Sequence, residues 1–237
     1  MPAAPQVCAT FSHAAQHGSD LWKVDITQAF TQADAFPLDV HIYIQPPEGH
    51  EDPGYVWRLL WPLYGLARAP AAWSCTLRTY LVSEGWKPVT EGEDTMYTYT
   101  VPIQLVNNRD NIMILVFHVD NILGSSHPSC SAYADKFKAK LLKCFKGRDE
   151  GSATRYISMD IHRVQDRIYL TQTPLIEELV DSIGLTGCNP VISAMQAGTK
   201  LLAEDRPAQP DIARTKLYQH IVGILQYLTT WTRLCYT

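Results

Sequence analysis

The chain has 237 residues, of which 46% are hydrophobic and 19% are charged, an ordinary globular balance. That length suits one large domain or two small ones with a sizeable core. The net charge of −4 has the wrong sign for a dedicated nucleic-acid-binding protein, unless the basic residues gather on one face.

The six cysteines are scattered, with no CxxC pair, which is typical of reduced thiols in a cytosolic or nuclear protein. No N-terminal apolar run has the length of a signal peptide, and no segment approaches a membrane span. We therefore expect a protein that is not secreted and that has no membrane partner. P-loop, GxGxxG and HExxH motifs do not occur.

Residues 1–20 are weakly patterned, so we expect regular structure to begin near Leu21. His13 and His17 are spaced to share a helix face, as a solvated pair or as metal ligands; without a third ligand or an acid nearby, the pattern favours the solvated pair. From Leu21 onwards a short strand is predicted, and Asp25 lies inside it.

The next elements are two strands and a helix. Residues 39–44 alternate strictly between polar and apolar side chains, which predicts a half-buried strand, and residues 55–60 are a second strand candidate. The turn-rich segment 62–70 opens a helix, with Pro70 in its first turn. The predicted buried stripe of that helix consists of Trp73, Leu77, Tyr80 and Leu81.

Residues 111–126, NIMILVFHVDNILGSS, predict two short strands around a tight turn. The turn would carry His118, Asp120 and Asn121. A carboxylate between two such strands is costly unless a metal ion or solvent meets it at the tip. A surface hairpin with a polar tip is the alternative, and the stretch alone leaves both interpretations open.

The second half of the chain predicts three helices and a hairpin. Residues 131–146 form an amphipathic pattern whose lysine-rich face is either simply solvated or in contact with phosphate. A hairpin over 156–171 and a helix over 174–183, capped by Thr173, follow. Residues 186–210 indicate a linker, and one more helix closes the chain. Paired strands with separate helices favour an α+β fold.

Asp25 and Asp120 are the residues whose chemistry stands out. Two acids from neighbouring strands could hold Mg²⁺, which prefers hard oxygen ligands and leaves positions open for phosphate oxygens. A pair of such ions can activate a 3′-hydroxyl and stabilise a leaving pyrophosphate. Spacing alone does not separate this interpretation from two unrelated acids.

Seven segments, in order along nearly the whole chain from Leu21, resemble the motifs of the reverse transcriptase of Ty1/copia-type LTR retrotransposons. One such match would be weak, but seven in the correct order indicate common descent. The segments are LWKVDITQAF (21–30), VHIYIQPPEGH (40–50, resembling QPEGF), WRLLWPLYGLARAPAAW (57–73, resembling LYGLKQAPRAW), SEGWKPVTEGEDTMY (83–97), FHVDN (117–121, resembling YVDD), RYISMDIHR (155–163, resembling YFLGIEI) and YQHIVGILQYLTTWTR (218–233).

The resemblance implies a right-hand polymerase palm with an antiparallel sheet and packed helices, partial fingers and a thumb-like C-terminal part. The implied division is an N-terminal remnant over 1–20, a palm with partial fingers over 21–165 and a thumb-like segment over 166–237. The implied activity is RNA-directed DNA synthesis on a primed RNA or DNA template. It would use deoxynucleoside triphosphates and two Mg²⁺ ions, with Mn²⁺ as a substitute. The module would act inside a retroelement polyprotein with integrase and RNase H, in a cytoplasmic particle or in the nucleus.

Site residues follow from the same resemblance, position by position. Asp25 and Asp120 match the metal-binding aspartates, and Asn121 stands beside them where the family has a second Asp. Phe30 matches the aromatic gate beneath the sugar, which crowds a 2′-hydroxyl. The remaining nucleotide-binding positions are Ile26, through its carbonyl, and Tyr64, Gly65, Ala69 and Pro70; the primer-support positions are Tyr156, Ile157, Ser158, Met159, Asp160 and Ile161.

Several positions depart from the family pattern. The amide of Asn121 adds no negative charge, and Ser158 replaces the glycine of the FLGI motif. The basic and polar residues of the LKQAPR segment are replaced by Ala67, Arg68 and Ala71. The upstream finger strands and the RNase H domain are expected to be missing. Two functions therefore stay open: a polymerase module, or a decayed or repurposed fragment that keeps the fold as a nucleic-acid or protein binding module.

Overall fold

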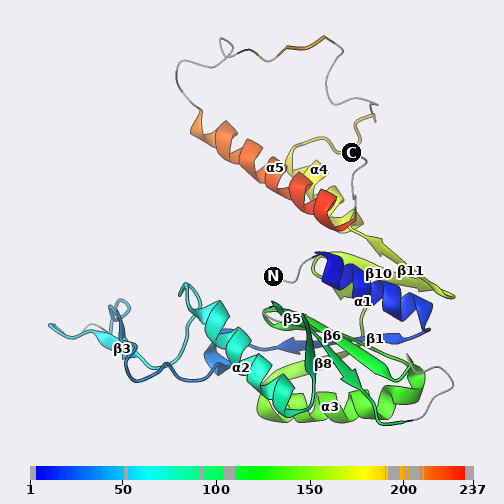
Figure 1. Ribbon diagram of the computed structural model, residues 1–237. Helices are drawn as coiled ribbons and strands as arrows, with labels where there is room; N and C mark the ends of the chain where they lie inside the picture. Colours follow the sequence, from blue (N-terminus) through cyan, green and yellow to red (C-terminus); the bar gives the residue numbers. More distant parts are fainter. Residues whose placement is uncertain are drawn as a thin grey trace. The chain divides into compact units, whose positions relative to one another are not determined.

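The computed structural model describes residues 4–50, 53–90, 93–103, 110–189 and 211–232, and single positions at 191, 198–200, 202 and 209. The chain divides into two compact units (Figure 1). Unit 1 is Met1–Ile157 with Ile161–Tyr169, and unit 2 is Ser158–Asp160 with Leu170–Thr237. The α+β class predicted from the sequence is confirmed, since antiparallel strands and separate helices make up the described residues. The domain boundaries at 20/21 and 165/166 stay predictions.

A six-stranded sheet forms the centre of unit 1, in the order β4-β5-β6-β7-β1-β8, and every neighbouring pair is antiparallel. The predicted central hairpin is confirmed as β6 and β7. The sheet consists of β4 (Lys87–Thr90), β5 (Glu93–Thr100), β6 (Ile112–His118), β7 (Asn121–Ser126), β1 (Asp20–Ile26) and β8 (Gly147–Ser152).

Two smaller sheets complete the strands. In the first, β2 (Ile42–Ile44) pairs with β3 (Trp57–Leu59), and both strands are shorter than the sequence pattern indicates. The second has the order β11-β10-β9. Its strands are β9 (Arg155–Tyr156), β10 (Met159–Val164) and β11 (Arg167–Thr171).

Two helices cover one face of the six-stranded sheet (Figure 1). They are α2 (Ala69–Ser83) and α3 (Ser131–Cys144), as their apolar periodicity predicts. Alternate strand side chains point at them, because side chains in a strand change face at every residue. The core between sheet and helices includes Trp22, Val24, Ile26, Trp73, Leu77, Leu81, Leu115, Phe117, Ile122, Phe137 and Leu141.

The opposite face is partly covered by α1 (Ala4–Gln16), which contacts β6 and β7. Val7, Phe11 and Ala14 are buried there. The expectation that structure begins near Leu21 is therefore wrong. The helix was missed because its buried stripe is short and consists partly of alanine. It also explains why β6 is apolar on both faces, since both faces are packed.

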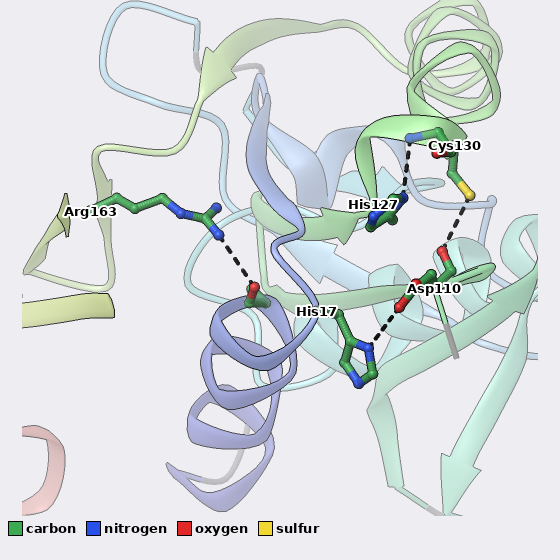
Figure 2. A network of polar contacts seen from close by, with 7 residues as sticks. His17, Asp110, His127, Cys130 and Arg163 are labelled. Atoms are coloured by element: carbon green, nitrogen blue, oxygen red, sulfur yellow. Dashed lines mark hydrogen bonds and ion pairs between the residues drawn. The ribbon is translucent and has the colours of Figure 1, made fainter. Parts of the chain in front are cut away.

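Polar contacts at the end of α1 tie this region to the segment before β6 and to β10 (Figure 2). The Nδ1 atom of His17 lies 2.8 Å from Oδ1 of Asp110, and the His17 side chain is only 6% exposed. Arg163 donates from Nη1 to the carbonyl oxygen of Ser19 at 2.6 Å. The ring of His13 stacks on that of His17, with 4.5 Å between centroids. The solvated pair expected from the sequence is wrong, because the His17 side chain is buried against Asp110 and both ring nitrogens of His13 are buried.

Unit 2 contains α4 (Thr173–Ser182) and α5 (Ile212–Trp231). Thr173 was expected to cap α4, but Gln172 occupies the cap position and makes no side-chain cap hydrogen bond. Asp211 caps α5 by accepting from the backbone N–H of Arg214 at 3.1 Å. Most of the expected linker over 186–210 lies outside the described residues. Among the described helices, none is long and apolar enough to cross a membrane.

Candidate active site

Asp25 and Asp120 come together at one end of the six-stranded sheet. Asp25 lies near the end of β1, directly opposite Asn121, the first residue of β7. Directly opposed residues of antiparallel strands present their side chains on the same face. Asp120 belongs to the turn between β6 and β7, and its carbonyl oxygen accepts from the N–H of Ile26 at 2.8 Å. The turn is therefore attached to β1 immediately beside Asp25.

The turn itself is strained and clamped. Val119 has φ 55°, a left-handed conformation that is unfavourable for a β-branched residue. The indole N–H of Trp73, one turn into α2, donates to the Val119 carbonyl at 2.7 Å. Strain of this kind persists only where surrounding structure fixes it, and it is common at functional sites. Trp73 thus fixes the position of the neighbouring Asp120.

The oxygen donors at the turn suit a divalent cation. Asp25 and Asp120 are half-buried carboxylates, and the Asn121 amide donates from Nδ2 to Oδ1 of Asp120 at 2.9 Å. Carboxylate and amide oxygens are hard ligands of the kind Mg²⁺ takes, with its other positions filled by water and phosphate. The described residues contain no cluster of three or more His, Cys, Asp or Glu side chains placed to hold a metal ion. A cation bound here would therefore be held by two carboxylates together with oxygens of the substrate.

An aromatic pair borders the carboxylates. Phe30 lies in the 3₁₀ helix η1 (Ala29–Gln32) that follows β1, and its ring centroid is 4.6 Å from that of Tyr64. The pKa of the Tyr64 hydroxyl is raised, first by burial and then by the negative charge of Asp120; a hydrogen bond with the Ala29 backbone partly offsets this, and Asp25 makes a smaller contribution. Tyr64 therefore stays protonated near both carboxylates and keeps a hydroxyl that can donate a hydrogen bond.

The amide of Gln32 joins η1 to the start of β8. Its Nε2 donates to the carbonyl oxygen of Lys146 at 2.9 Å, and its Oε1 accepts from the Lys146 N–H at 2.6 Å. Gly147 follows, and a Cβ there would lie 2.5 Å from the Asp25 carbonyl oxygen, so only glycine fits. The two strands are consequently held close together at Asp25.

Of the other predicted nucleotide-binding residues, Ala69 and Pro70 begin α2, Gly65 precedes it, and Ile26 ends β1. Gly65 has φ 93°, and Ala69 is fully buried at the first position of the helix. Pro70 stands in the first helical turn, as predicted. The Ile26 side chain is buried in the core, while its N–H holds the Asp120 carbonyl.

The predicted primer-support residues form the turn between β9 and β10. Ile157 and Ser158 have φ 45° and 54°, both left-handed. The family's glycine at the position of Ser158 has a physical reason here, because glycine adopts this conformation without strain. Within unit 2 the Ser158 hydroxyl hydrogen-bonds with the Tyr227 side chain. Of the other predicted residues, Tyr156 and Met159 are buried and Ile161 lies at the edge of burial.

Three residues shape this site in ways that sequence reasoning did not show, although His118 was already placed at the turn. The pattern placed Trp73 in the core, but its N–H also needs a partner when buried, which is the signal that could have identified the clamp. His118 lies opposite Asn121; burial lowers its pKa, while the charge of Asp120 opposes that shift. Gln32 gave no signal, because its contact with the start of β8 is made with the backbone of Lys146, a residue far along the chain.

Comparison with known proteins identifies the family to which this arrangement of residues belongs. Residues 7–197 match the family model described as reverse transcriptase (RNA-dependent DNA polymerase). The chain belongs to this family. The match begins inside α1 and includes every candidate site residue named above.

Transposon proteins are among its curated relatives. Over 209 residues the chain is 27% identical to the retrovirus-related Pol polyproteins from transposons RE2 and RE1 of Arabidopsis thaliana. Over 211 residues it is 25% identical to a Ty5-1 transposon protein of Saccharomyces cerevisiae. These alignments cover 86–87% of this chain. The chain spans 13% of the length of each Arabidopsis polyprotein and 62% of the yeast protein. The reverse transcriptase domain is thus that of a Ty1/copia-like element.

Proposed function

We propose that this reverse transcriptase module catalyses RNA-directed DNA synthesis at the β6–β7 turn. The observation that carries the proposal is the placement of Asp25, Asp120 and Asn121 on the end of two neighbouring strands, beside Phe30 and Tyr64. Template, primer and deoxynucleoside triphosphates would be its substrates. In this proposal the sheet and its helices are the palm, the β2–β3 region belongs to the fingers, and α4 and α5 belong to the thumb.

Asp25 and Asp120 would hold the divalent cations, Mg²⁺ or Mn²⁺, with the carbonyl of Ile26 as a further oxygen. Bound there, the metal would lower the pKa of the primer 3′-hydroxyl and neutralise charge on the reacting phosphates. The chain's own contribution is positioning, which such transfer reactions depend on. Trp73 and Ile26 hold the turn fixed, so the two carboxylates need little reorganisation when substrate arrives.

Phe30 would lie beneath the sugar of the incoming nucleotide. Its contact with Tyr64 keeps the ring in place. The pair would crowd a 2′-hydroxyl and so favour deoxyribonucleotides. Phe30→Ala should then admit ribonucleotides, measured as the ratio of dTTP to UTP incorporation. Unchanged discrimination would contradict the gate.

Primer extension on poly(rA)–oligo(dT), with Mg²⁺ or Mn²⁺, tests the polymerase directly. We expect extension by the parent chain and its loss in Asp25→Asn. Asp20→Asn is the matched control, since Asp20 is an exposed carboxylate at the other end of the same strand. Equal extension by Asp25→Asn and the parent would show that the carboxylate is not catalytic.

Asn121 favours a second candidate function, in which the fold binds nucleic acid or protein without synthesis. An amide at this position leaves two carboxylates to face up to four positive charges, so metal binding is weaker than with three. Under this candidate the parent chain binds a primed template but extends no primer with either metal ion.

A further inference from the structure

Three neighbouring strands align charged and polar side chains in one row at the catalytic end of the sheet. Asn121 of β7 lies opposite Asp25 of β1, and Asp25 lies opposite Arg148 of β8. Opposed residues of antiparallel strands share a face. Arg148 therefore lies beside the carboxylate that is proposed to bind metal, on the open edge strand of the sheet.

The face of the sheet on which the Arg148 side chain lies follows from the position of the next residue, Asp149. Asp149 points toward the helices, because its Oδ2 lies 2.8 Å from Nζ of Lys138 on α3. Side chains alternate along a strand, so Arg148 points to the opposite face, away from α2 and α3. Lys23, two residues before Asp25 in β1, lies on the same face as Asp25.

Glu150 connects these cations. Its carboxylate lies 2.8 Å from Nη2 of Arg148 and 2.9 Å from Nζ of Lys23. Hydrogen bonds from Lys23 and from Arg148 lower the pKa of Glu150, so it stays anionic at neutral pH. Within the group of Lys23, Glu150 and Arg148, one carboxylate lies between two cations, so this group has one positive charge in excess beside the Asp25 carboxylate. The Arg148 side chain is 73% exposed, and its contact with Glu150 uses Nη2.

Stability does not account for the Arg148–Glu150 pair, because an ion pair whose arginine is 73% exposed contributes little to folding. Charged side chains do protect edge strands from pairing with other chains, and that is the competing explanation. Edge protection, however, does not require the arginine to lie beside Asp25. It also does not require Arg148 to be held by Glu150, which is itself held by Lys23. An arginine presents a fork of N–H donors suited to phosphate oxygens.

We propose that Arg148, oriented by Glu150, binds a phosphate of the polymerase substrate next to Asp25. The inference rests on the proposed function. The phosphate is either the last phosphodiester of the primer or part of the incoming triphosphate. Arg148 is then a binding residue, and Glu150 is a positioning residue that acts through it.

Fluorescence anisotropy with a labelled rA–dT primer–template, its primer ending in a dideoxynucleotide, tests this at several salt concentrations. EDTA is present in the first arm, and dTTP with Mg²⁺ in the second. We expect Arg148→Ala to weaken duplex binding severalfold and to reduce the salt slope by about 1, as for loss of one phosphate contact. Arg148→Lys should retain part of the affinity. Lys143→Ala, which removes an exposed cation from the other side of the sheet, should have no effect.

The arms separate the two sources of phosphate. A loss already present in EDTA identifies the primer, and a loss seen only with dTTP identifies the triphosphate. Glu150→Gln separates two effects by the direction of the change in affinity. If Glu150 acts only through its charge, removing that charge should tighten duplex binding. If Glu150 orients Arg148, the same change should weaken binding. Tighter binding would overturn the role of Glu150.

Equal affinities of Arg148→Ala and Lys143→Ala in both arms would overturn the inference while leaving the proposed function intact. A parent chain that binds no duplex in either arm would contradict the proposed function, and this inference with it.

Discussion

At the scale of single residues, Asn121 decides how strongly the turn attracts a cation. Its amide donates to Asp120 and carries no charge, so the site has one carboxylate fewer than the family pattern. Asn121→Asp should raise affinity for Mg²⁺ or Mn²⁺ roughly tenfold, because an added charge a few ångströms from a cation contributes several kcal/mol before desolvation costs. Without metal the new carboxylate would repel Asp120, so the variant should melt lower than the parent in EDTA.

Isothermal titration calorimetry and thermal melting with and without Mg²⁺ measure both effects. Asn111→Asp is the matched control, since it also loses an amide hydrogen bond, to the Val101 carbonyl, but precedes β6 at the opposite end of the strand from the turn. Equal metal affinity of Asn121→Asp and the parent would mean that two carboxylates suffice.

His13 makes stability depend on pH. Burial lowers its pKa below the ordinary 6.5, the neighbouring His17 lowers it further, and Asp110 partly offsets this. Both ring nitrogens are buried without a hydrogen-bond partner. A lowered pKa in the folded state means that the unfolded chain binds the proton first, so stability is present above pH 6.5 and falls as pH drops below it.

Urea unfolding between about pH 5 and 8, the range in which histidine titrates, measures this dependence. His13→Leu should lose less stability than the parent on acidification, since the proton uptake by this residue is gone. Ser12→Ala, at an exposed position of the same helix, is the control. The same slope in His13→Leu as in the parent would assign the pH dependence to other groups.

At the scale of elements, the hydrogen bond from α2 to the β6–β7 turn can be tested by comparing two buried tryptophans, Trp73 and Trp22. The Trp73 N–H donates to Val119, whereas the Trp22 N–H is buried without a hydrogen-bond partner. Replacing either by Phe removes a similar volume, but only Trp73→Phe leaves the Val119 carbonyl unsatisfied. We expect Trp73→Phe to cost about 1–2 kcal/mol more than Trp22→Phe, the usual cost of an orphaned buried group.

Chemical denaturation of both variants gives that difference. Hydrogen exchange at the β6–β7 turn gives a second measure, since faster exchange is expected in Trp73→Phe alone. Equal costs for the two variants would show that the indole hydrogen bond does not hold the turn.

Periodicity predicted the elements that bury a regular stripe. The stripe of Trp73, Leu77 and Leu81 gave α2, and the apolar run of β6 gave the central hairpin. It failed for β8, whose residues are exposed and carry no large apolar side chain, because a strand held by its backbone ladder and by ion pairs from Asp149 and Glu150 gives no apolar signal. The same absence hid Arg148, whose position beside Asp25 depends on pairing between residues far apart in the sequence.

The candidate site shows the same limit. The resemblance of motifs located Asp25, Asp120 and Phe30, because each lies within a continuous motif. It could not show the Ile26 and Trp73 contacts to the turn, or the left-handed Val119. Those depend on a register and a helix position that form only when the core packs.

At the scale of the whole molecule, the two units differ in how much apolar surface they bury. The large core cluster lies entirely within unit 1. In unit 2, α5 buries only Leu228 and Trp231 among its described side chains, and Thr232 donates to Oε1 of Gln172 at 2.7 Å. Local opening is easiest where few apolar contacts are lost.

Amide hydrogen exchange followed by mass spectrometry should therefore show much lower protection in α5 than in β1, β6 and β7. The first turns of α5 should exchange fastest, because Ile212, Leu217 and Tyr218 are exposed and Leu228 and Trp231 lie at its far end. Leu228→Ala should accelerate exchange in α4 and α5 while leaving β1 and β6 unchanged, since the large core cluster of unit 1 contains no residue of α5. Leu225→Ala, at a half-exposed position of the same helix, is the matched control and should change little. Equal protection in α5 and the central strands would contradict this, and would mean that the two units open as one cooperative structure.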